Sequence, residues 1–298
     1  MKRTNRREFI QAGVAGIAGL AAISAGFRDR GFSPADATID KVKLGSTGLT
    51  VPRVALGTGS GGWKNESNQT RLGTKKFVDL AQHAYDRGIK FFDTADMYGS
   101  HEYVREALKV IPRDKVSILT KVMVYDQSGW YKTEPFQTSL DRFRKEVGTE
   151  YFDILLLHCL MNGQWPTEYK NYMEGLSRAK EKGIIRTIGI SCHNIDAMKE
   201  ASVNPWVDVL LARINHKGPK MDGTPDEVMQ VLETARKNGK GVIGMKVFGM
   251  GDLVQDDQRE KSLNYVIKSG NVHCMTLGLE SREQVDDAVS RVMRIVNS

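Results

Sequence analysis

Short runs of apolar residues recur along the chain, and each run is too apolar to have one face in water. Such runs are typical of parallel strands that are buried on both faces. The runs cover residues 54–57, 89–95, 116–122, 152–158, 187–192, 207–214, 241–247 and 272–278. Ahead of the first run, the turn residues Gly45–Gly48 lie between two apolar-rich segments, which predicts a β-hairpin.

Amphipathic helical patterns separate most of these runs. In residues 75–88, apolar residues recur at i, i+3 and i+4, and the pattern ends at a glycine. Similar patterns cover residues 101–110, 136–148, 172–183, 226–239 and 281–296. Gly88, Gly148, Gly183 and Gly239 supply the stop that is expected at the C-terminal end of a helix.

Strands that alternate with helices, without a Pro-rich or low-complexity linker, predict a (β/α)8 TIM barrel over residues 38–298. The alternative is an open doubly wound sheet, in which a glycine-rich turn after the first strand opens a helix. The first strand here leads into GTGSGGW (57–63), which opens no obvious helix. We therefore expect the closed barrel, with the N-terminal β-hairpin capping its bottom.

The charge balance of the chain is modestly basic. The 298 residues carry a formal net charge of +7, and 40% of them are hydrophobic, which is normal for a globular protein. Residues 1–37 hold six basic groups against three acidic ones, so the remainder has 37 basic and 33 acidic groups, a net of +4. Because no basic patch is interleaved with aromatic residues, we expect no nucleic-acid partner.

The first 37 residues have the features of a leader. A basic start precedes a Gly/Ala-rich stretch that is too short and too weakly hydrophobic for a membrane span. NRREFI (5–10) resembles a twin-arginine export signal, and Ala35–Ala37 could form a cleavage site. We expect a twin-arginine signal peptide, recognition by that export machinery and an extracytoplasmic, periplasmic location. A basic tail or an uncleaved anchor is the alternative.

Four chemically suitable side chains lie where apolar runs end. Asp93 and Tyr98 belong to GIKFFDTADMYG, Lys121 ends VSILTK, and His158 ends FDILLLH. In a TIM barrel the strand ends meet at the C-terminal face, which is where such barrels build their sites. The sequence therefore predicts that these four residues form a proton-transfer site.

The proposed chemistry starts from the phenol. A free tyrosine has a pKa of about 10, and a nearby ammonium should lower it. Asp93 would pair with Lys121, His158 would orient a carbonyl, and Tyr98 would deliver a proton as hydride arrives. Each residue alone also has a simpler interpretation: an ordinary ion pair, rim packing, or a satisfied core histidine.

The chain resembles the aldo-keto reductases over nearly all of residues 41–290. The resemblance rests on LGSTGLTVPRVALGTG, GIKFFDTADMYGSHEYVREAL, ILTKV, FDILLLH and GIIRTIGIS. It implies a TIM barrel that binds a nicotinamide cofactor in extended form, without a Rossmann domain. It also implies an NAD(P)-dependent reduction of an aldehyde or ketone, or the reverse, with Tyr98 as the acid and Asp93, Lys121 and His158 completing the tetrad.

The same resemblance suggests where the cofactor would bind. Cys192, Leu211 and Met245 depart from the family pattern, which usually has asparagine, glutamine and an aromatic residue there. The implied cofactor residues are Gly57, Thr58, Ser191, Cys192, Met245, Lys246, Gly278, Gln284 and Asp287. Family habit implies NADP(H), whereas Glu280 near the adenosine end leaves NAD(H) open.

The substrate is expected to be a small carbonyl compound. Trp63, Trp130 and Tyr131 lie in loops that follow strands, so they could line a pocket for an apolar or ring-shaped body. The chain ends soon after its last helix, from which we expect an open pocket. The residues His193, His216, Cys159 and Cys192 do not have the spacing of a zinc motif, so no metal is expected.

Two further expectations concern the state of the protein. The three cysteines, an odd number, make a poor disulfide framework, and buried thiols at Cys159, Cys192 and Cys274 are expected. We expect a monomer. The competing function is a non-enzymatic or regulatory barrel that binds a dinucleotide or another ligand without turnover; the intact tetrad favours the enzyme.

Overall fold

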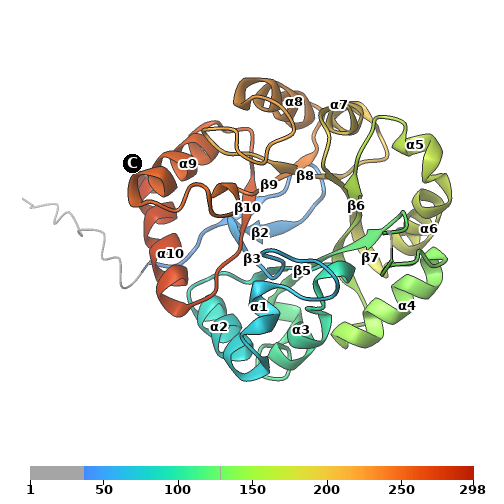
Figure 1. Ribbon diagram of the computed structural model, residues 1–298, viewed down its shortest axis with the longest axis horizontal. Coiled ribbons are helices and arrows are strands. Elements are labelled where there is room, and N and C mark those ends of the chain that lie inside the picture. Colours follow the sequence, from blue (N-terminus) through green and yellow to red (C-terminus); the bar gives the residue numbers. More distant parts are fainter. Residues whose placement is uncertain (1–36, 128) are drawn as a thin grey trace, which may run out of the picture. The chain divides into compact units, whose positions relative to one another are not determined.

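The computed structural model describes residues 37–127 and 129–298, and the predicted leader, apart from Ala37, lies outside them. Eight parallel strands close into a barrel in the order β10-β3-β4-β5-β6-β7-β8-β9 (Figure 1). Their bounds are β3 Val54–Gly57, β4 Phe91–Asp93, β5 Ser117–Met123, β6 Phe152–Leu160, β7 Ile185–Cys192, β8 Val209–Arg213, β9 Gly241–Met245 and β10 Cys274–Leu277. The predicted TIM barrel and each of its strands are confirmed.

Helices surround the barrel (Figure 1). They are α1 Asn68–Arg71, α2 Thr74–Asp86, α3 His101–Ala107, α4 Phe136–Val147, α5 Trp165–Glu168, α6 Lys170–Glu181, α7 Ile195–Val203, α8 Pro225–Lys237, α9 Asp256–Lys268 and α10 Arg282–Asn297. Three short 3-10 helices join them: η1 Asp96–Tyr98, η2 Arg113–Lys115 and η3 Gly249–Gly251. The predicted helices are confirmed, and Gly148 ends α4 in the left-handed region at φ 69°. The helices α1, α5, α7 and α9 were not predicted.

The N-terminal hairpin closes one end of the barrel. Strands β1 (Lys41–Lys43) and β2 (Thr50–Pro52) pair antiparallel, and Lys43 faces Thr50 across the predicted turn. Leu44 is fully buried in the cluster that fills the barrel interior. The Ser46 amide donates to the Gly239 carbonyl at 2.8 Å, beside the first residue of β9. The hairpin therefore caps the N-terminal end of the barrel, as expected.

Two large apolar clusters make up most of the described core, and a third, smaller one lies around Tyr98. The inner one fills the barrel with residues such as Phe91, Leu119 and Ile154, and the outer one packs strands against helices. The interior is narrow: a Cβ atom on Gly189 would lie 1.9 Å from the Val209 carbonyl oxygen. Because the interior is filled, a ligand can reach the strands only at the C-terminal mouth. No helix in the described part of the chain is long and apolar enough to cross a membrane.

Candidate active site

The four predicted residues meet at the C-terminal mouth of the barrel. Asp93 ends β4, Lys121 lies in β5 and His158 in β6, so neighbouring strands position three of them. Tyr98 ends η1, which follows β4. Its hydroxyl lies 3.5 Å from the Lys121 Nζ and 3.5 Å from the His158 Nε2. The structure therefore brings together the tetrad that the sequence predicted.

A buried ion pair lies beneath the phenol. The Lys121 ammonium donates to the Asp93 carboxylate and to the Thr94 carbonyl, the latter at 2.9 Å. The side chains of Lys121 and Asp93 are only 1% and 7% exposed. Burying two charges is costly unless each has a partner, and here each neutralises the other. The pair holds the ammonium beside Tyr98 without leaving a free charge inside the barrel.

The pKa of the Tyr98 phenol is shifted in the opposite direction from the one expected. Burial raises the pKa of Tyr98 well above its usual value, and the Asp93 carboxylate raises it further. The prediction that Lys121 lowers this pKa was wrong, because Asp93 offsets the ammonium and burial disfavours the phenolate. Burial also lowers the pKa of His158 well below its usual value, and Lys121 adds to this effect. Near neutral pH both the phenol and the imidazole are therefore uncharged.

Two glycines hold the Tyr98 ring in place. A Cβ atom on Gly59 would lie 2.3 Å from the ring, and one on Gly62 would lie 2.6 Å from it. Residues 57–62 have the G-x-G-x-x-G spacing of a dinucleotide-binding turn, but a turn follows them and the next helix begins only at Asn68. The absence of side chains at these positions makes room for the Tyr98 ring. The sequence analysis missed this role of the glycine-rich loop.

The turn that carries Tyr98 is anchored by Asp96, another residue that the sequence analysis missed. Asp96 is buried, forms an ion pair with Arg142 at 2.8 Å, and accepts a hydrogen bond from the Tyr131 hydroxyl at 2.6 Å. Tyr131 is thus a buried support, and the structure does not place it as an open pocket wall. The available signal was an acidic residue two positions before Tyr98, in the same short segment of sequence.

Two tryptophans cover one side of the mouth. The rings of Trp63 and Trp130 lie 4.9 Å apart, although they come from loops after β3 and β5. Trp63 is 47% exposed, which is unusual for so large an apolar side chain. Trp130 packs with Met97 and Met123 in the cluster around Tyr98, whereas Trp63 contacts it from outside, and neither tryptophan lines the cavity described below.

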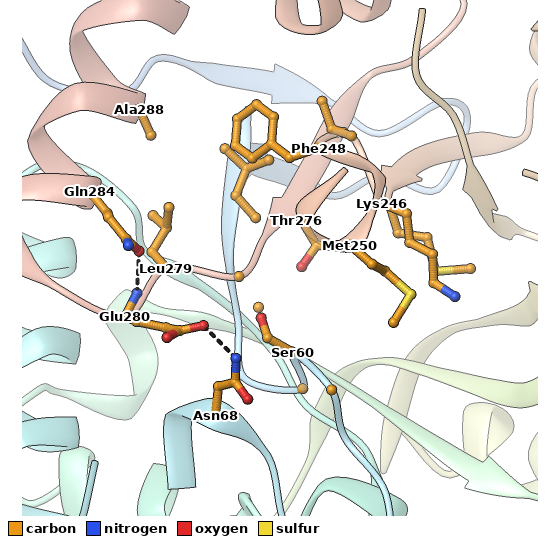
Figure 2. Close-up of a pocket in the computed structure, with 18 of the residues that line it drawn as sticks. Ser60, Asn68, Lys246, Phe248, Met250, Thr276, Leu279, Glu280, Gln284 and Ala288 are labelled. Carbon is orange, nitrogen blue, oxygen red and sulfur yellow. Dashed lines mark hydrogen bonds between the residues drawn. The ribbon is translucent and has the colours of Figure 1, made fainter. Parts of the chain in front are cut away.

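A cavity of about 470 Å³ runs from the tetrad toward the start of α10. Tyr98 and Asp93 line it at one end. Of the predicted cofactor residues, it is lined by Gly57, Met245, Lys246, Gly278, Gln284 and Asp287. Figure 2 shows Gln284 and Glu280 side by side: the Glu280 amide donates to Gln284 Oε1 at 2.8 Å, and Asn68 donates to Glu280 Oε1 at 2.8 Å.

The other predicted cofactor residues, Thr58, Ser191 and Cys192, do not line this cavity. Thr58 is fully buried, and its hydroxyl donates a hydrogen bond to the Asp93 carbonyl at 2.9 Å. It therefore supports β4, the strand that ends at Asp93. The buried Ser191 hydroxyl has no partner in the described part of the chain, which leaves it available to a ligand. Cys192 packs in the outer cluster on the helix side of β7, so its position does not support a cofactor contact. Leu211 packs in the inner core.

The histidines and cysteines near the mouth form no metal cluster within the described residues, 37–127 and 129–298. Cys159 and His193 do approach each other, with Sγ and Nε2 3.5 Å apart. Burial raises the pKa of Cys159 to about 11, so this thiol is protonated near neutral pH. Cys192 and Cys274 are buried and free, as expected for packed thiols.

Comparisons with known proteins agree with this site. Residues 54–294 match the sequence model of the Aldo/keto reductase family. A soybean (Glycine max) protein described as probable aldo-keto reductase 1 is 31% identical over 229 residues, covering 72% of this chain but only 61% of its own length. Arabidopsis thaliana L-galactose dehydrogenase is 27% identical, covering 79% of this chain and 75% of its own length. The solved structure of a putative aldo-keto reductase from Pseudomonas aeruginosa superposes with a TM-score of 0.73 at 22% identity, covering 89% and 99% of the two chains.

Proposed function

Because the chain belongs to the aldo/keto reductase family, we propose that it is an NAD(P)H-dependent oxidoreductase that reduces an aldehyde or ketone to an alcohol, or catalyses the reverse. The observation that carries this proposal is the Tyr98 hydroxyl. It lies within 3.5 Å of both Lys121 and His158 and lines the cavity of about 470 Å³ at the barrel mouth. A barrel that only binds a ligand has no need of such an arrangement.

The glycine-rich surface of the cavity and its polar groups are suited to a nicotinamide dinucleotide. The rim of the cavity is rich in glycine, including Gly57, Gly59 and Gly278, so backbone can approach a ligand closely. The buried hydroxyls of Ser191 and Thr276 lack partners among the described residues. Gln284 and Asp287, in the first turns of α10, line the other end. A reduced nicotinamide bound there would supply the hydride.

The residues of the tetrad then divide the proton chemistry. Tyr98 keeps its proton near neutral pH, because burial raises its pKa, and donates it from the hydroxyl to the carbonyl oxygen. The transfer remains favourable because an alkoxide is a stronger base than a phenolate. The Lys121 ammonium, 3.5 Å away, stabilises the phenolate that is left. The neutral His158 ring can hydrogen-bond the carbonyl oxygen and orient it.

Replacing Tyr98 with phenylalanine tests the proposal. Tyr98→Phe should lower kcat by about 10²–10⁴, the usual contribution of a general acid, while cofactor affinity stays within about twofold. Steady-state reduction of a panel of aldehydes and a fluorescence titration of the cofactor give the two values. Tyr103→Phe is the matched control, since Tyr103 lies on α3 against Phe77 and should change neither value. Full turnover by Tyr98→Phe would contradict the mechanism and favour a binding role.

The preference between the two cofactors depends on the adenosine end of the cavity. We propose NADP(H), because Arg259 lines this end and its buried Nε has no partner among the described residues. Its other nitrogens pair with Asp287 at 3.0 Å and Asp256 at 3.2 Å. The opposing feature is the Glu280 carboxylate, which disfavours a 2′-phosphate.

Arg259→Met should weaken NADPH binding by about tenfold or more, since a hydrogen bond to a charged group contributes roughly 1.5–3 kcal/mol. NADH binding should stay within about twofold. Arg291 would still pair with Asp287, so the local fold is kept. Arg294→Met, on the exposed side of α10, is the control. If the unmodified protein binds NADH as tightly as NADPH, the proposed preference is wrong.

We also propose that the protein is exported through the twin-arginine pathway and works outside the cytoplasm as a monomer. The export proposal rests on Arg6 and Arg7 in the leader, and the monomer on a site that one chain builds. Because that pathway generally carries folded proteins, the barrel would fold around its cofactor first. Protein from the exported fraction should then sediment as one chain with bound dinucleotide. Freshly isolated exported protein with an empty cavity would argue against this route.

A further inference from the structure

The basic side chains beside the tetrad differ in whether a carboxylate of the described chain pairs with them. Lys121 pairs with Asp93, and Arg213 pairs with the buried Asp222 at 3.2 Å. Lys246 has no carboxylate within 4.0 Å among residues 37–127 and 129–298. Lys246 is therefore a positive charge at the cavity that no carboxylate of the described chain pairs with.

The position of Lys246 is fixed by its backbone. It directly follows β9 with a φ of 55°, in the left-handed region that favours glycine. Its carbonyl accepts hydrogen bonds from the Gly249 amide at 2.8 Å and from the Asn215 side chain at 3.2 Å. The side chain is half-buried and lines the same cavity as Tyr98. The lysine is thus held at the cavity and does not extend freely into solvent.

The ammonium faces the tetrad and not the adenosine end. Figure 2 shows Lys246 on the opposite side of the cavity from Gln284 and Glu280. Its electrostatic neighbours agree. Burial and Arg213 lower the pKa of Lys246 to about 8, whereas Cys159 raises it. Lys246 in turn contributes to the lowered pKa of His158. The unpaired charge therefore lies on the side of the mouth where a carbonyl would meet Tyr98 and His158.

An unpaired, half-buried ammonium beside a reacting carbonyl is suited to an anion. The nearest carboxylate, Asp222, also acts on Lys246, but it forms its ion pair with Arg213 at 3.2 Å. The neighbouring His193 is largely buried, and burial and Arg213 lower its pKa to about 2, so its ring is neutral and can donate one hydrogen bond. The surroundings of Lys246 are thus those of a site for one negative group.

We propose that Lys246 binds an anionic group, a carboxylate in the first instance, that is carried by the carbonyl substrate. The substrate class is then an aldehyde or ketone with an acid group a short chain away from the carbonyl. This inference rests on the proposed reductase function. The pyrophosphate of the cofactor is the other anion that could reach Lys246, and the experiment below separates the two sources.

Lys246→Met removes the charge and keeps an unbranched side chain of similar length. The probes are the semialdehyde of succinic acid and its methyl ester, which differ in one negative charge. The unmodified enzyme should favour the acid. The variant should raise KM for the acid by about tenfold to hundredfold, the effect of losing one hydrogen bond to a charged group, and leave KM for the ester within about twofold. Lys199→Met, an exposed lysine on α7, is the charge-matched control and should change neither.

Two binding measurements complete the design. Calorimetry with succinate, which needs no turnover, should detect binding to the unmodified protein and at least about tenfold weaker binding to Lys246→Met. This difference would support the anion site even if neither aldehyde is reduced, in which case the reductase proposal alone fails. Equal KM ratios for acid and ester in both proteins would overturn the inference. Weaker NADPH binding with an unchanged acid-to-ester ratio would also overturn it and assign Lys246 to the cofactor.

Discussion

The buried ion pair between Lys121 and Asp93 is the constraint on which the rest of the site depends. Two charges from adjacent strands lie inside the barrel with almost no exposure, and each is tolerable only because the other is present. Removing one partner of such a pair typically costs about 3–5 kcal/mol, because the other charge is left buried and alone. The pair therefore links the C-terminal end of β4 to β5 and sets where an ammonium meets the phenol.

The surrounding structure places two uncharged side chains, Tyr98 and His158, next to this buried ion pair. Gly59 and Gly62 make room for the Tyr98 ring, and Asp96 anchors the turn that carries it. Burial keeps the Tyr98 hydroxyl protonated and the His158 ring neutral, so both can donate hydrogen bonds to a carbonyl oxygen. The negative charge that develops on that oxygen during reduction is what the site is built to receive.

Local patterns were enough to predict the barrel and the tetrad, because strands that are buried on both faces leave a continuous apolar signal and end at the mouth. They could not give the direction of a side chain or its burial. Cys192 adjoins Ser191 in sequence, yet it faces the helices. The pKa of Tyr98 depends on surroundings that only the folded chain provides. Helix α9, which begins with a run of polar residues, has too weak an apolar stripe to be recognised, and with it the cavity-lining Arg259 was missed.

The most direct test of this account is a spectroscopic titration of the Tyr98 phenol in the cofactor-free protein. Subtracting the ultraviolet absorbance of Tyr98→Phe from that of the unmodified protein isolates this one phenolate. The account predicts no phenolate signal at neutral pH and none until the pH exceeds the ordinary tyrosine value of about 10. A phenolate that forms well below that value would show that the ammonium outweighs burial and Asp93, and would contradict the protonated donor on which the mechanism rests.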